Sequence, residues 1–310
     1  MADRPRIVFM GTPDFAVPSL AACVELGEVV RVVTQPDKPK GRGRERAAPP
    51  GKTWAFGHGL AVSQPEKLKA GRFHEELVPL APDVAVVAAY GKILPPELLL
   101  VPRMGCVNVH ASLLPKYRGA APIQWAIANG EAKTGVCLMR LEAGLDTGPL
   151  FACAEMAIGP DDTGGSMHDA LAILGADLLR AELPAYLAGE RTPVPQDHAQ
   201  ATLAPILKKE DGRLDFGSTA RLLEARLRAF TPWPGAFTFI HGKLVKVLRA
   251  RAAQGRGEPG EVIEVGTQGI ELACKEGSLV LLELLPEGKR PMSAAQFLAG
   301  HPLARGERIG

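Results

Sequence analysis

Four short, nearly continuous apolar runs most constrain what this chain can fold into. They read RIVFMG (6–11), VVRVVTQ (29–35), DVAVVAAYG (83–91) and GCVNVHA (105–111), and helical patterns such as DFAVPSLAACVELG lie between them. Such runs are apolar at successive positions, which is typical of parallel strands that helices cover on both faces. The sequence therefore predicts an α/β fold class with a Rossmann-like, mostly parallel sheet in the N-terminal domain.

The second half of the chain follows a different pattern. A helical period over 164–190 is expected to close the first domain, and residues 191–208 have the proline-rich, polar composition of a linker. Beyond the linker, TARLLEARLRAF predicts an amphipathic helix, and glycine-punctuated apolar runs predict short strands at regular spacing. We therefore predict a catalytic domain at 1–190, a linker at 191–208 and an OB-like β-barrel domain at 209–310.

Composition indicates a globular protein, because 46% of the residues are hydrophobic and 23% are charged. The apolar run behind the first arginines is too short for a signal-peptide core, so a cytoplasmic location is expected. No apolar stretch approaches the roughly 18 residues of a membrane span, so no membrane partner is expected, and a monomer is the default. The five cysteines are scattered and are expected to be buried, reduced thiols, and no His or Cys spacing predicts a metal site.

The first predicted strand leads into GTPDFA rather than into a glycine-rich phosphate loop. Thr12 is expected to cap the next helix, and Pro13 fits its first position but has no N–H to offer a phosphate. Asp14 adds a negative charge that would repel an anion. This start therefore disfavours dinucleotide binding and an NAD-dependent oxidoreductase.

Two hydrogen-bonding side chains occupy alternate positions of the fourth run. In a strand, Asn108 and His110 point to one face, near the carboxyl end where open α/β sheets build their sites. A carboxamide and an imidazole side by side can stabilise the oxyanion of an acyl transfer, and Asp146 in GLDTG could keep His110 charged. No Ser or Cys is placed as an obvious nucleophile, so direct attack by a substrate amine is the simpler mechanism. On the residues alone, a structural histidine remains the alternative.

Positive charge is concentrated in two places, although the formal net charge is only +2. Residues 208–256 hold eleven Lys and Arg against four Asp and Glu, and QPDKPKGRGRER (35–46) holds five basic residues. Such segments suggest an anionic partner, although they are more often only solvated.

The motif NVHASLLPKYRGAAPIQWAI, followed by GLDTG, resembles the signature of the 10-formyltetrahydrofolate-dependent formyltransferases. The stretches RIVFMGTPDFAVPSL, TQPDKPKGRGR, AAYGKILP, GRLDF and LRAFTPWPGAF extend the resemblance over nearly the whole chain, most closely to the branch that acts on methionyl-tRNA. The resemblance implies formyl transfer from 10-formyltetrahydrofolate to the methionine amine of initiator methionyl-tRNA, for translation initiation.

The resemblance also implies roles for individual residues. It makes Asn108, His110 and Asp146 catalytic, with Asn108 and protonated His110 stabilising the oxyanion. The folate is expected at two stretches: Ser112, Leu113, Leu114 and Pro115, and Tyr90, Lys92, Ile93 and Leu94. The tRNA is expected at two basic groups: Lys38, Arg42 and Arg44, and Lys243, Lys246 and Arg249. The last three have mixed spacing along one predicted strand, so they need not share a face.

Other readings of the sequence remain. A 10-formyltetrahydrofolate hydrolase shares the implied catalytic residues and is the second interpretation. A glycinamide ribonucleotide formyltransferase would carry a phosphate-binding glycine loop in place of Gly11-Thr12-Pro13, and a sugar-nucleotide formyltransferase would lack LRAFTPWP. A non-catalytic RNA-binding protein could explain the basic segments but would leave Asn108, His110 and Asp146 without a purpose.

Overall fold

The computed structural model describes residues 4–40, 45–68 and 71–310. Contacts divide the chain into two compact units. The N-terminal unit comprises Met1–Pro122, Lys133–Ala157 and His168–Pro205, and the C-terminal unit comprises Ile123–Ala132, Ile158–Met167 and Ile206–Gly310. Two short segments that precede the predicted linker thus cluster with the C-terminal residues. The domain boundaries at 190 and 208 stay a prediction.

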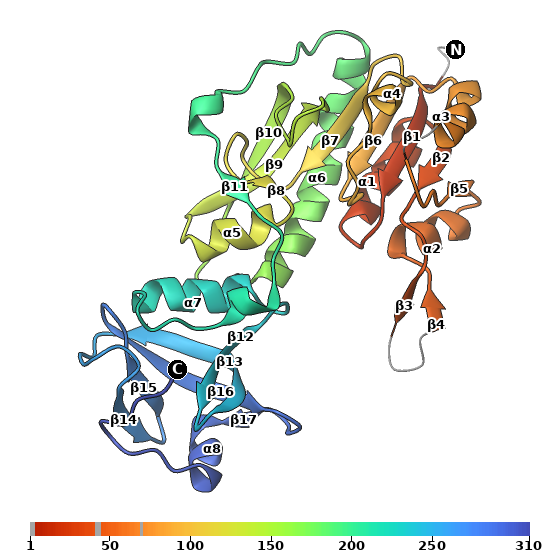
Figure 1. Cartoon of the computed structure of the whole chain (residues 1–310). Helices are drawn as coiled ribbons and strands as arrows, with labels where there is room; N and C mark the ends of the chain where they lie inside the picture. The colour runs from red at the N-terminus through yellow and green to blue at the C-terminus, as the bar shows by residue number, and fades with distance from the viewer. Residues whose placement is uncertain (1–3, 41–44, 69–70) are drawn as a thin grey trace. The chain divides into compact units, whose positions relative to one another are not determined.

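A seven-stranded sheet forms the centre of the N-terminal unit, in the order β10-β9-β7-β6-β1-β2-β5 (Figure 1). The strands from β7 to β5 run parallel, and β9 and β10 run antiparallel at one edge. The predicted mostly parallel sheet is therefore confirmed. Its strands are β1 (Arg6–Gly11), β2 (Glu28–Val33), β5 (Val62–Ser63), β6 (Val84–Ala88), β7 (Cys106–His110), β9 (Lys133–Arg140) and β10 (Leu150–Ala157).

Burial on both faces explains why the predicted strands are apolar throughout. Every residue of β6 and β7 is buried. Val109 of β7 lies beneath α6, close to Gly175, while Cys106 of β7 joins an apolar cluster with Met10 and Phe73. The helices of the first 190 residues are α1 (Ala16–Leu26), α2 (Pro50–Gly57), α3 (Arg72–Leu77), α4 (Pro96–Leu99), α5 (Pro122–Ala128) and α6 (Gly164–Leu187). Two short strand pairs accompany them: β3 (Lys38–Lys40) with β4 (Glu45–Ala47), and β8 (Arg118–Gly119) with β11 (Leu203–Ala204).

The predicted cap of the first helix is wrong. Helix α1 begins at Ala16, Phe15 occupies the capping position, and no side chain caps it. The hydroxyl of Thr12 instead donates to the Tyr90 carbonyl oxygen at 3.2 Å and accepts from the Gln35 backbone N–H at 3.2 Å. Thr12 therefore joins loops that follow three different strands, partners that a local sequence pattern cannot show.

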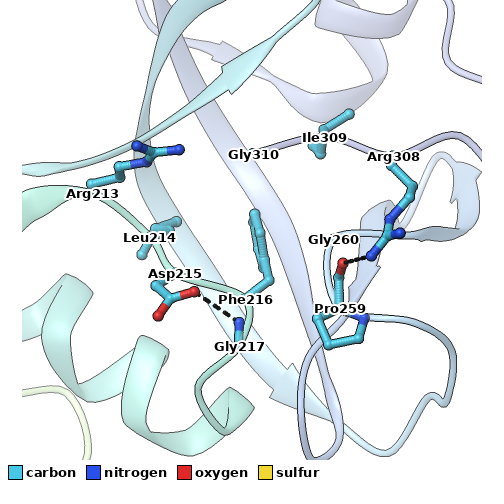
Figure 2. A pocket seen from close by; sticks show the side chains of 10 residues that line it. All are labelled: Arg213, Leu214, Asp215, Phe216, Gly217, Pro259, Gly260, Arg308, Ile309 and Gly310. Carbon is cyan, nitrogen blue, oxygen red and sulfur yellow. Dashed lines mark hydrogen bonds between the residues drawn. The ribbon is translucent and has the colours of Figure 1, made fainter.

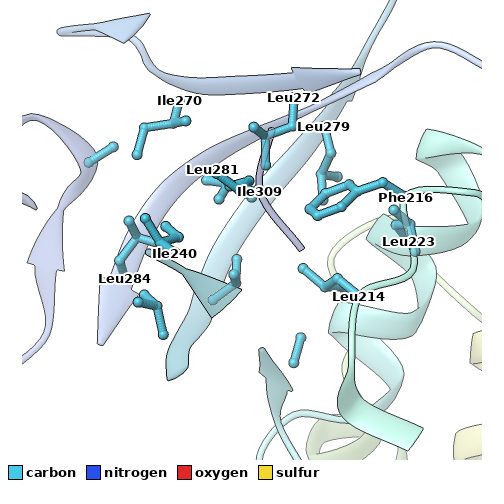
Figure 3. Close-up of a cluster of buried hydrophobic side chains, with 14 of the residues drawn as sticks. Leu214, Phe216, Leu223, Ile240, Ile270, Leu272, Leu279, Leu281, Leu284 and Ile309 are labelled. Atoms are coloured by element: carbon cyan, nitrogen blue, oxygen red, sulfur yellow. The ribbon is translucent and has the colours of Figure 1, made fainter. Parts of the chain in front are cut away.

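The C-terminal unit is built on an antiparallel sheet in the order β12-β13-β16-β15-β14, with β17 paired to β16. Its core packs leucines and isoleucines of the sheet against Leu223 of α7, Phe216 and Ile309 (Figure 3). The backbone N–H of Ile309 donates to Gly260 and that of Gly310 to Phe239, which ties together the two ends of the sheet. This all-β architecture agrees with the predicted fold class. Its elements are α7 (Ala220–Ala229), β12 (Ala236–Ile240), β13 (Lys243–Ala253), β14 (Val262–Gly266), β15 (Gly269–Ala273), β16 (Ser278–Pro286), β17 (Met292–Ser293) and α8 (Ala294–Gly300).

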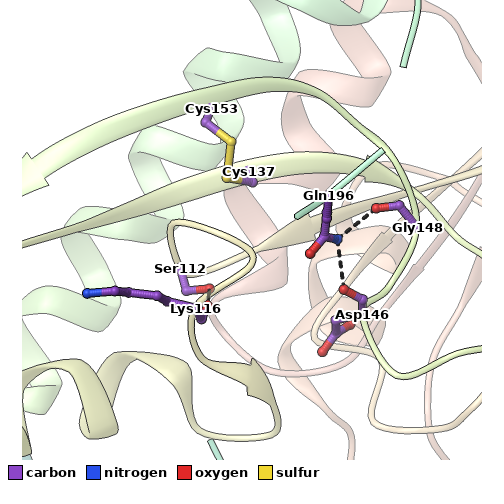
Figure 4. The surroundings of a disulfide bond; sticks show 7 residues. All are labelled: Ser112, Lys116, Cys137, Asp146, Gly148, Cys153 and Gln196. Carbon is purple, nitrogen blue, oxygen red and sulfur yellow. Dashed lines mark hydrogen bonds between the residues drawn. A yellow bond between two sulfur atoms is a disulfide. The ribbon is translucent and has the colours of Figure 1, made fainter. Parts of the chain in front are cut away.

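The expectation of five separate thiols is wrong for Cys137 and Cys153, which form a disulfide between β9 and β10 (Figure 4). The register of these antiparallel strands sets the two residues directly opposite each other, with 4.1 Å between their Cα atoms. The sequence could not show this pairing, because β10 was not among the predicted strands. Cys23, Cys106 and Cys274 are buried free thiols, as expected, and burial raises the pKa of Cys106 to about 12.

Among the residues that the structure describes, no helix combines the length and apolar character needed to cross a membrane.

Candidate active site

The candidate active site begins at the carboxyl end of β7. Asn108 and His110 are only 9% and 5% exposed, although both are polar. They share one face of the strand, as the alternation predicts, while Val107 and Val109 pack on the other. Parallel pairing places Asn108 beside Val87 of β6, so the carboxamide lies within the sheet rather than at its edge.

Both ring nitrogens of His110 face oxygen atoms. Its Nε2 lies 3.1 Å from the carbonyl oxygen of Tyr117, and its Nδ1 lies 3.7 Å from Oδ2 of Asp146. The second distance is that of an ion pair and is longer than a hydrogen bond. A protonated imidazole has two N–H donors and can serve both acceptors at once. The predicted His110–Asp146 pair is therefore brought together, close to Asn108.

The carboxylate of Asp146 is fixed by the backbone around it. Asp146 has a φ of 49°, and its Oδ2 accepts a hydrogen bond of 2.8 Å from the N–H of Gly119. A Cβ atom on Gly148 would lie 1.8 Å from the carbonyl oxygen of Arg140, so the loop can return to β9 only with glycine there. The glycines around Asp146 thus allow the tight turn that directs its carboxylate toward His110.

The stretch from Ser112 to Pro115 forms a closed turn directly after His110. The Ser112 backbone N–H donates to the His110 carbonyl, and the Ser112 hydroxyl donates to the Lys116 carbonyl at 2.7 Å. The Leu114–Pro115 peptide is cis, and Leu114 is buried against Cys137 and Met139. The turn therefore lies beside the catalytic candidates, and its role in binding folate stays a prediction.

The second stretch predicted to bind folate divides its side chains between core and solvent. Tyr90 and Leu94 are buried in the apolar cluster beneath the sheet, and burial raises the pKa of Tyr90 to about 12. Lys92 donates to the carbonyl oxygens of Pro65 and Glu66, and burial is the main cause that lowers its pKa. Only Ile93 is largely exposed, at 84%. A role for these residues toward folate stays a prediction.

Hydrogen bonds fix the start of the basic segment that follows β2. Arg42 and Arg44 lie outside the described residues, while Lys38 belongs to the β3–β4 hairpin. The preceding Asp37 accepts two hydrogen bonds of 2.8 Å from Nζ of Lys52 and a further one from Gln64. This network fixes the chain directly before the β3–β4 hairpin.

A β-bulge brings two of the three predicted cations of β13, Lys246 and Arg249, onto one face. Pairing with β16 is irregular around Arg249, so the alternation changes phase there. Val245 and Val247 point into the core before the bulge, and Ala250 and Ala252 pack against the core after it. The exposed residues Lys246, Arg249 and Arg251 therefore share the outer face, while Lys243 is exposed at the start of the strand.

Aromatic rings lie on the same outer face. Phe237 of β12 pairs directly with Lys246 and packs edge-to-face on Phe239. The guanidinium carbon of Arg213 lies 5.6 Å from the centre of the Phe239 ring. Cations interleaved with partly exposed rings are typical of surfaces that bind nucleic acid. We call this set of residues the basic face: Arg213, Phe237, Phe239, Lys246, Arg249 and Arg251.

A cavity of about 700 Å³ lies in the C-terminal unit (Figure 2). Arg213 and Arg308 lie at its two sides, and Phe216 lies between them. None of the ten residues that line it was predicted as a site residue. All ten belong to the C-terminal unit.

Two residues that support Asp146 were not predicted. Gln196 and Arg118 are both buried, and Gln196 hydrogen-bonds to the backbone of the Asp146 loop. Gln196 stands in the segment predicted as a linker, where nothing in the local pattern distinguishes it. Within the described residues, no group of three or more His, Cys, Asp and Glu is arranged to hold a metal ion.

Comparisons with known proteins give the family. The formyl transferase family profile matches residues 5–182, and the profile of the formyl transferase C-terminal domain matches residues 206–302. Methionyl-tRNA formyltransferase of Myxococcus xanthus is 63% identical over 305 residues, which is 98% of each chain. Methionyl-tRNA formyltransferase of Citrifermentans bemidjiense is 50% identical and covers 98% of this chain and 96% of its own.

Solved structures show the same fold at lower identity. The sugar 3N-formyl transferase WlaRD, determined with dTDP and 5-N-formyl-THF, superposes with a TM-score of 0.68 at 17% identity, over 93% of this chain and all of its own. HypX from Aquifex aeolicus in complex with tetrahydrofolic acid gives a TM-score of 0.59 at 18% identity. The comparison covers 99% of this chain but only 51% of HypX.

The hydrogen bonds of Asp37 predict that the free energy of unfolding depends on pH. Hydrogen bonds from Lys52 and then Gln64 lower the pKa of Asp37 below its ordinary value of 3.8. Asp37 therefore stabilises the fold above about pH 3.8, and this contribution is lost as the pH falls through the folded-state pKa. Urea unfolding of wild type and Asp37→Asn should show the largest difference at neutral pH and a vanishing one in acid.

The exposed Asp161→Asn serves as the control and should unfold like wild type at each pH. An Asp37→Asn difference that persists unchanged to the lowest pH measured would contradict the assigned role of the carboxylate.

Proposed function

The chain belongs to the formyl transferase family, and we propose that it transfers a formyl group from 10-formyltetrahydrofolate to the free amine of methionine on initiator methionyl-tRNA. One observation carries the proposal. The side chain of Asp146 lies 3.7 Å from that of His110 at the carboxyl end of β7, and Asn108 shares the face of His110 on this strand. These residues lie in a chain that is 63% identical over nearly its whole length to a methionyl-tRNA formyltransferase.

The proposed reaction is direct attack by the amine. The neutral methionine nitrogen adds to the formyl carbon, and the formyl oxygen becomes an oxyanion. The carboxamide N–H of Asn108 and the positive charge of His110 stabilise that oxyanion, since both lie on one face of β7. The bond between the formyl carbon and N10 then breaks. The attacking nitrogen loses a proton, and N10 of the folate gains one.

Asp146 supports both stages of this reaction. Its carboxylate lies 3.7 Å from Nδ1 of His110 and forms an ion pair with the imidazolium of the proposed scheme. With 13% of its side chain exposed, it can also reach a water molecule that carries the proton between the two nitrogens. No Ser, Cys or metal ion has a step in this scheme.

We assign the folate to the turn from Ser112 to Pro115 and to the stretch from Tyr90 to Leu94. The turn supports this because it begins at the backbone of His110. In the second stretch the exposed Ile93 is the side chain available for an apolar contact, while Tyr90, Lys92 and Leu94 shape its backbone.

We assign the tRNA to Lys38, Arg42 and Arg44 of the basic segment 35–46 and to the C-terminal unit, through Lys243 and the basic face. The shared outward direction of Lys246 and Arg249 supports this, because phosphate contacts need cations on one surface. A monomeric state and a cytoplasmic location, both expected from the sequence, belong to the same proposal.

The function is tested by assaying formyl transfer from 10-formyltetrahydrofolate to methionyl initiator tRNA. Reactions with methionyl elongator tRNA and with no acceptor run in parallel. Rapid formylation of the initiator species alone is the expected result. Release of formate without any formylated product would overturn the proposal and favour a 10-formyltetrahydrofolate hydrolase, in which water replaces the amine.

The catalytic roles predict large losses of turnover in three variants. Removal of one oxyanion donor typically lowers kcat about 100- to 1000-fold, so Asn108→Ala and His110→Ala should fall at least that far. Asp146→Asn should also lower kcat, because the imidazolium loses its counter-charge. Steady-state formylation assays measure these changes, and circular dichroism verifies that each variant is folded.

His74→Ala removes a histidine that is only half-buried in α3 and should leave kcat unchanged. A loss of less than about tenfold in Asn108→Ala or His110→Ala would be too small for an oxyanion donor and would contradict the assignment.

The basic face predicts effects on tRNA alone. Lys246→Ala and Arg249→Ala should raise KM for methionyl-tRNA and leave kcat and KM for the folate unchanged. If each residue contacts a phosphate, its loss should reduce the slope of log affinity against log salt by about 1. Lys289→Ala, an exposed lysine between β16 and β17, is the control and should bind tRNA like wild type. Equal weakening in all three variants would indicate only a general charge effect.

A further inference from the structure

The segment 194–204 has linker composition but is bound along the candidate active site. Val194 exchanges two backbone hydrogen bonds with Leu150, at 2.8 and 2.7 Å. Further on, β11 pairs in parallel with β8, directly after Tyr117. Thr202 contributes twice, since its hydroxyl accepts from the Tyr117 N–H and its carbonyl accepts from the Arg118 N–H. The segment therefore forms part of the surroundings of His110 and Asp146.

Gln196 makes the most extensive side-chain contacts of this segment and is only 6% exposed. Its Nε2 donates to the carbonyl oxygen of Asp146 at 2.9 Å and to that of Gly148 at 2.7 Å (Figure 4). Its Oε1 accepts from Nε and Nη2 of Arg118, at 3.2 and 2.6 Å. Both ends of the carboxamide are thus occupied, and one end holds the backbone of Asp146 itself.

Gln196 also serves as a hydrogen-bond acceptor for the buried side chain of Arg118. Arg118 as a whole is only 7% exposed, and a buried charge is costly unless polar groups surround it. Among the described residues, two side-chain acceptors face it: Oε1 of Gln196, and Nδ1 of His198 at 3.0 Å from Nη2. Arg118 therefore fixes the orientation of the Gln196 carboxamide, so that its amide end points at the Asp146 loop.

Three consecutive residues, 117–119, link this network to His110 and Asp146. The carbonyl of Tyr117 accepts from His110, the side chain of Arg118 orients Gln196, and the N–H of Gly119 donates to the Asp146 carboxylate. Gly119 also cannot carry a side chain, because a Cβ atom would lie 2.5 Å from the carbonyl oxygen of Ala204 in β11. Residues 117–119 thus hold the imidazole of His110 and the carboxylate of Asp146, while Gln196 holds the backbone of the Asp146 loop.

We propose that Gln196 is a positioning residue that sets the placement of Asp146 relative to His110. It holds the backbone of Asp146 and Gly148, while Gly119 holds the carboxylate. Gln196 does not touch the reacting atoms and acts through Asp146. The proposal rests on the proposed function only in assigning Asp146 a role in formyl transfer.

The test compares Gln196→Met with Gln200→Met. Methionine has nearly the volume of glutamine but cannot make these hydrogen bonds, so Gln196→Met releases the Asp146 loop without opening a large cavity. A displacement of about 1 Å can lower turnover about 100-fold, so kcat should fall by up to that factor while KM for both substrates stays unchanged. Gln200 is exposed, and its amide contacts only Asp197 among the described residues, so Gln200→Met should keep wild-type kcat and KM.

A double-variant cycle separates positioning from general stabilisation. If Gln196 acts through Asp146, Gln196→Met should cost no further turnover in an Asp146→Asn background. A structural residue would lower kcat by the same factor in both backgrounds, and that result would overturn the proposal. Wild-type kcat and KM in Gln196→Met would overturn it as well.

Hydrogen–deuterium exchange supplies a readout that does not depend on activity. The peptide that contains Gly119 should exchange faster in Gln196→Met than in wild type, because its amide loses the Asp146 acceptor, and it should be unchanged in Gln200→Met. Unchanged exchange at Gly119 in Gln196→Met would overturn the proposal even if the wild type transferred no formyl group. An inactive wild type with faster exchange in Gln196→Met would instead contradict the proposed function alone.

Discussion

The N-terminal unit depends on one constraint: β7 carries two polar side chains into a sheet that is covered on both faces. A buried polar group lowers stability unless it is hydrogen-bonded, so His110 needs partners that the sheet itself does not supply. They come from the loop after β7, through the Tyr117 carbonyl, and from the loop after β9, through Asp146. These loops need partners in turn, and the segment 194–204 provides them. The same contacts therefore satisfy the buried polar groups and set the geometry of the proposed catalytic residues.

The strained backbone conformations near His110 lie in the loops that follow β7 and β9. Tyr117 and Asp146 both have positive φ, at 62° and 49°, a conformation that costs about 1–3 kcal/mol for residues other than glycine. Each is held by contacts on both sides, since Tyr117 lies between His110 and Thr202, and Asp146 lies between Gly119 and Gln196. These contacts hold Tyr117 and Asp146 in one geometry, which suits residues that position His110 in the proposed reaction.

How far the sequence predicts this structure follows from the range of each interaction. The strands at β1 and β7 and the common face of Asn108 and His110 depend on local periodicity, and they were predicted correctly. Thr12, Gln196 and the Cys137–Cys153 disulfide depend on partners far along the chain or on an unpredicted strand, and no local pattern shows those. The shared face of Lys246 and Arg249 required a bulge, because regular alternation would have placed them on opposite faces. The pattern alone therefore left their placement open.

The two parts of the proposed site obey different physical rules. Around His110 the side chains of Gln196 and Arg118 that support the Asp146 loop are buried, so the loss of one hydrogen bond can displace a proposed catalytic group. On the basic face the cations are exposed, and Glu283 lies opposite Arg249, so each contact is weak and screened by salt. A large charged substrate can gain affinity from many such contacts without the accuracy that catalysis needs. In the proposed function, exposed cations bind the tRNA while buried hydrogen bonds position His110 and Asp146, which is why one bulge suffices for the first task and a closed network is needed for the second.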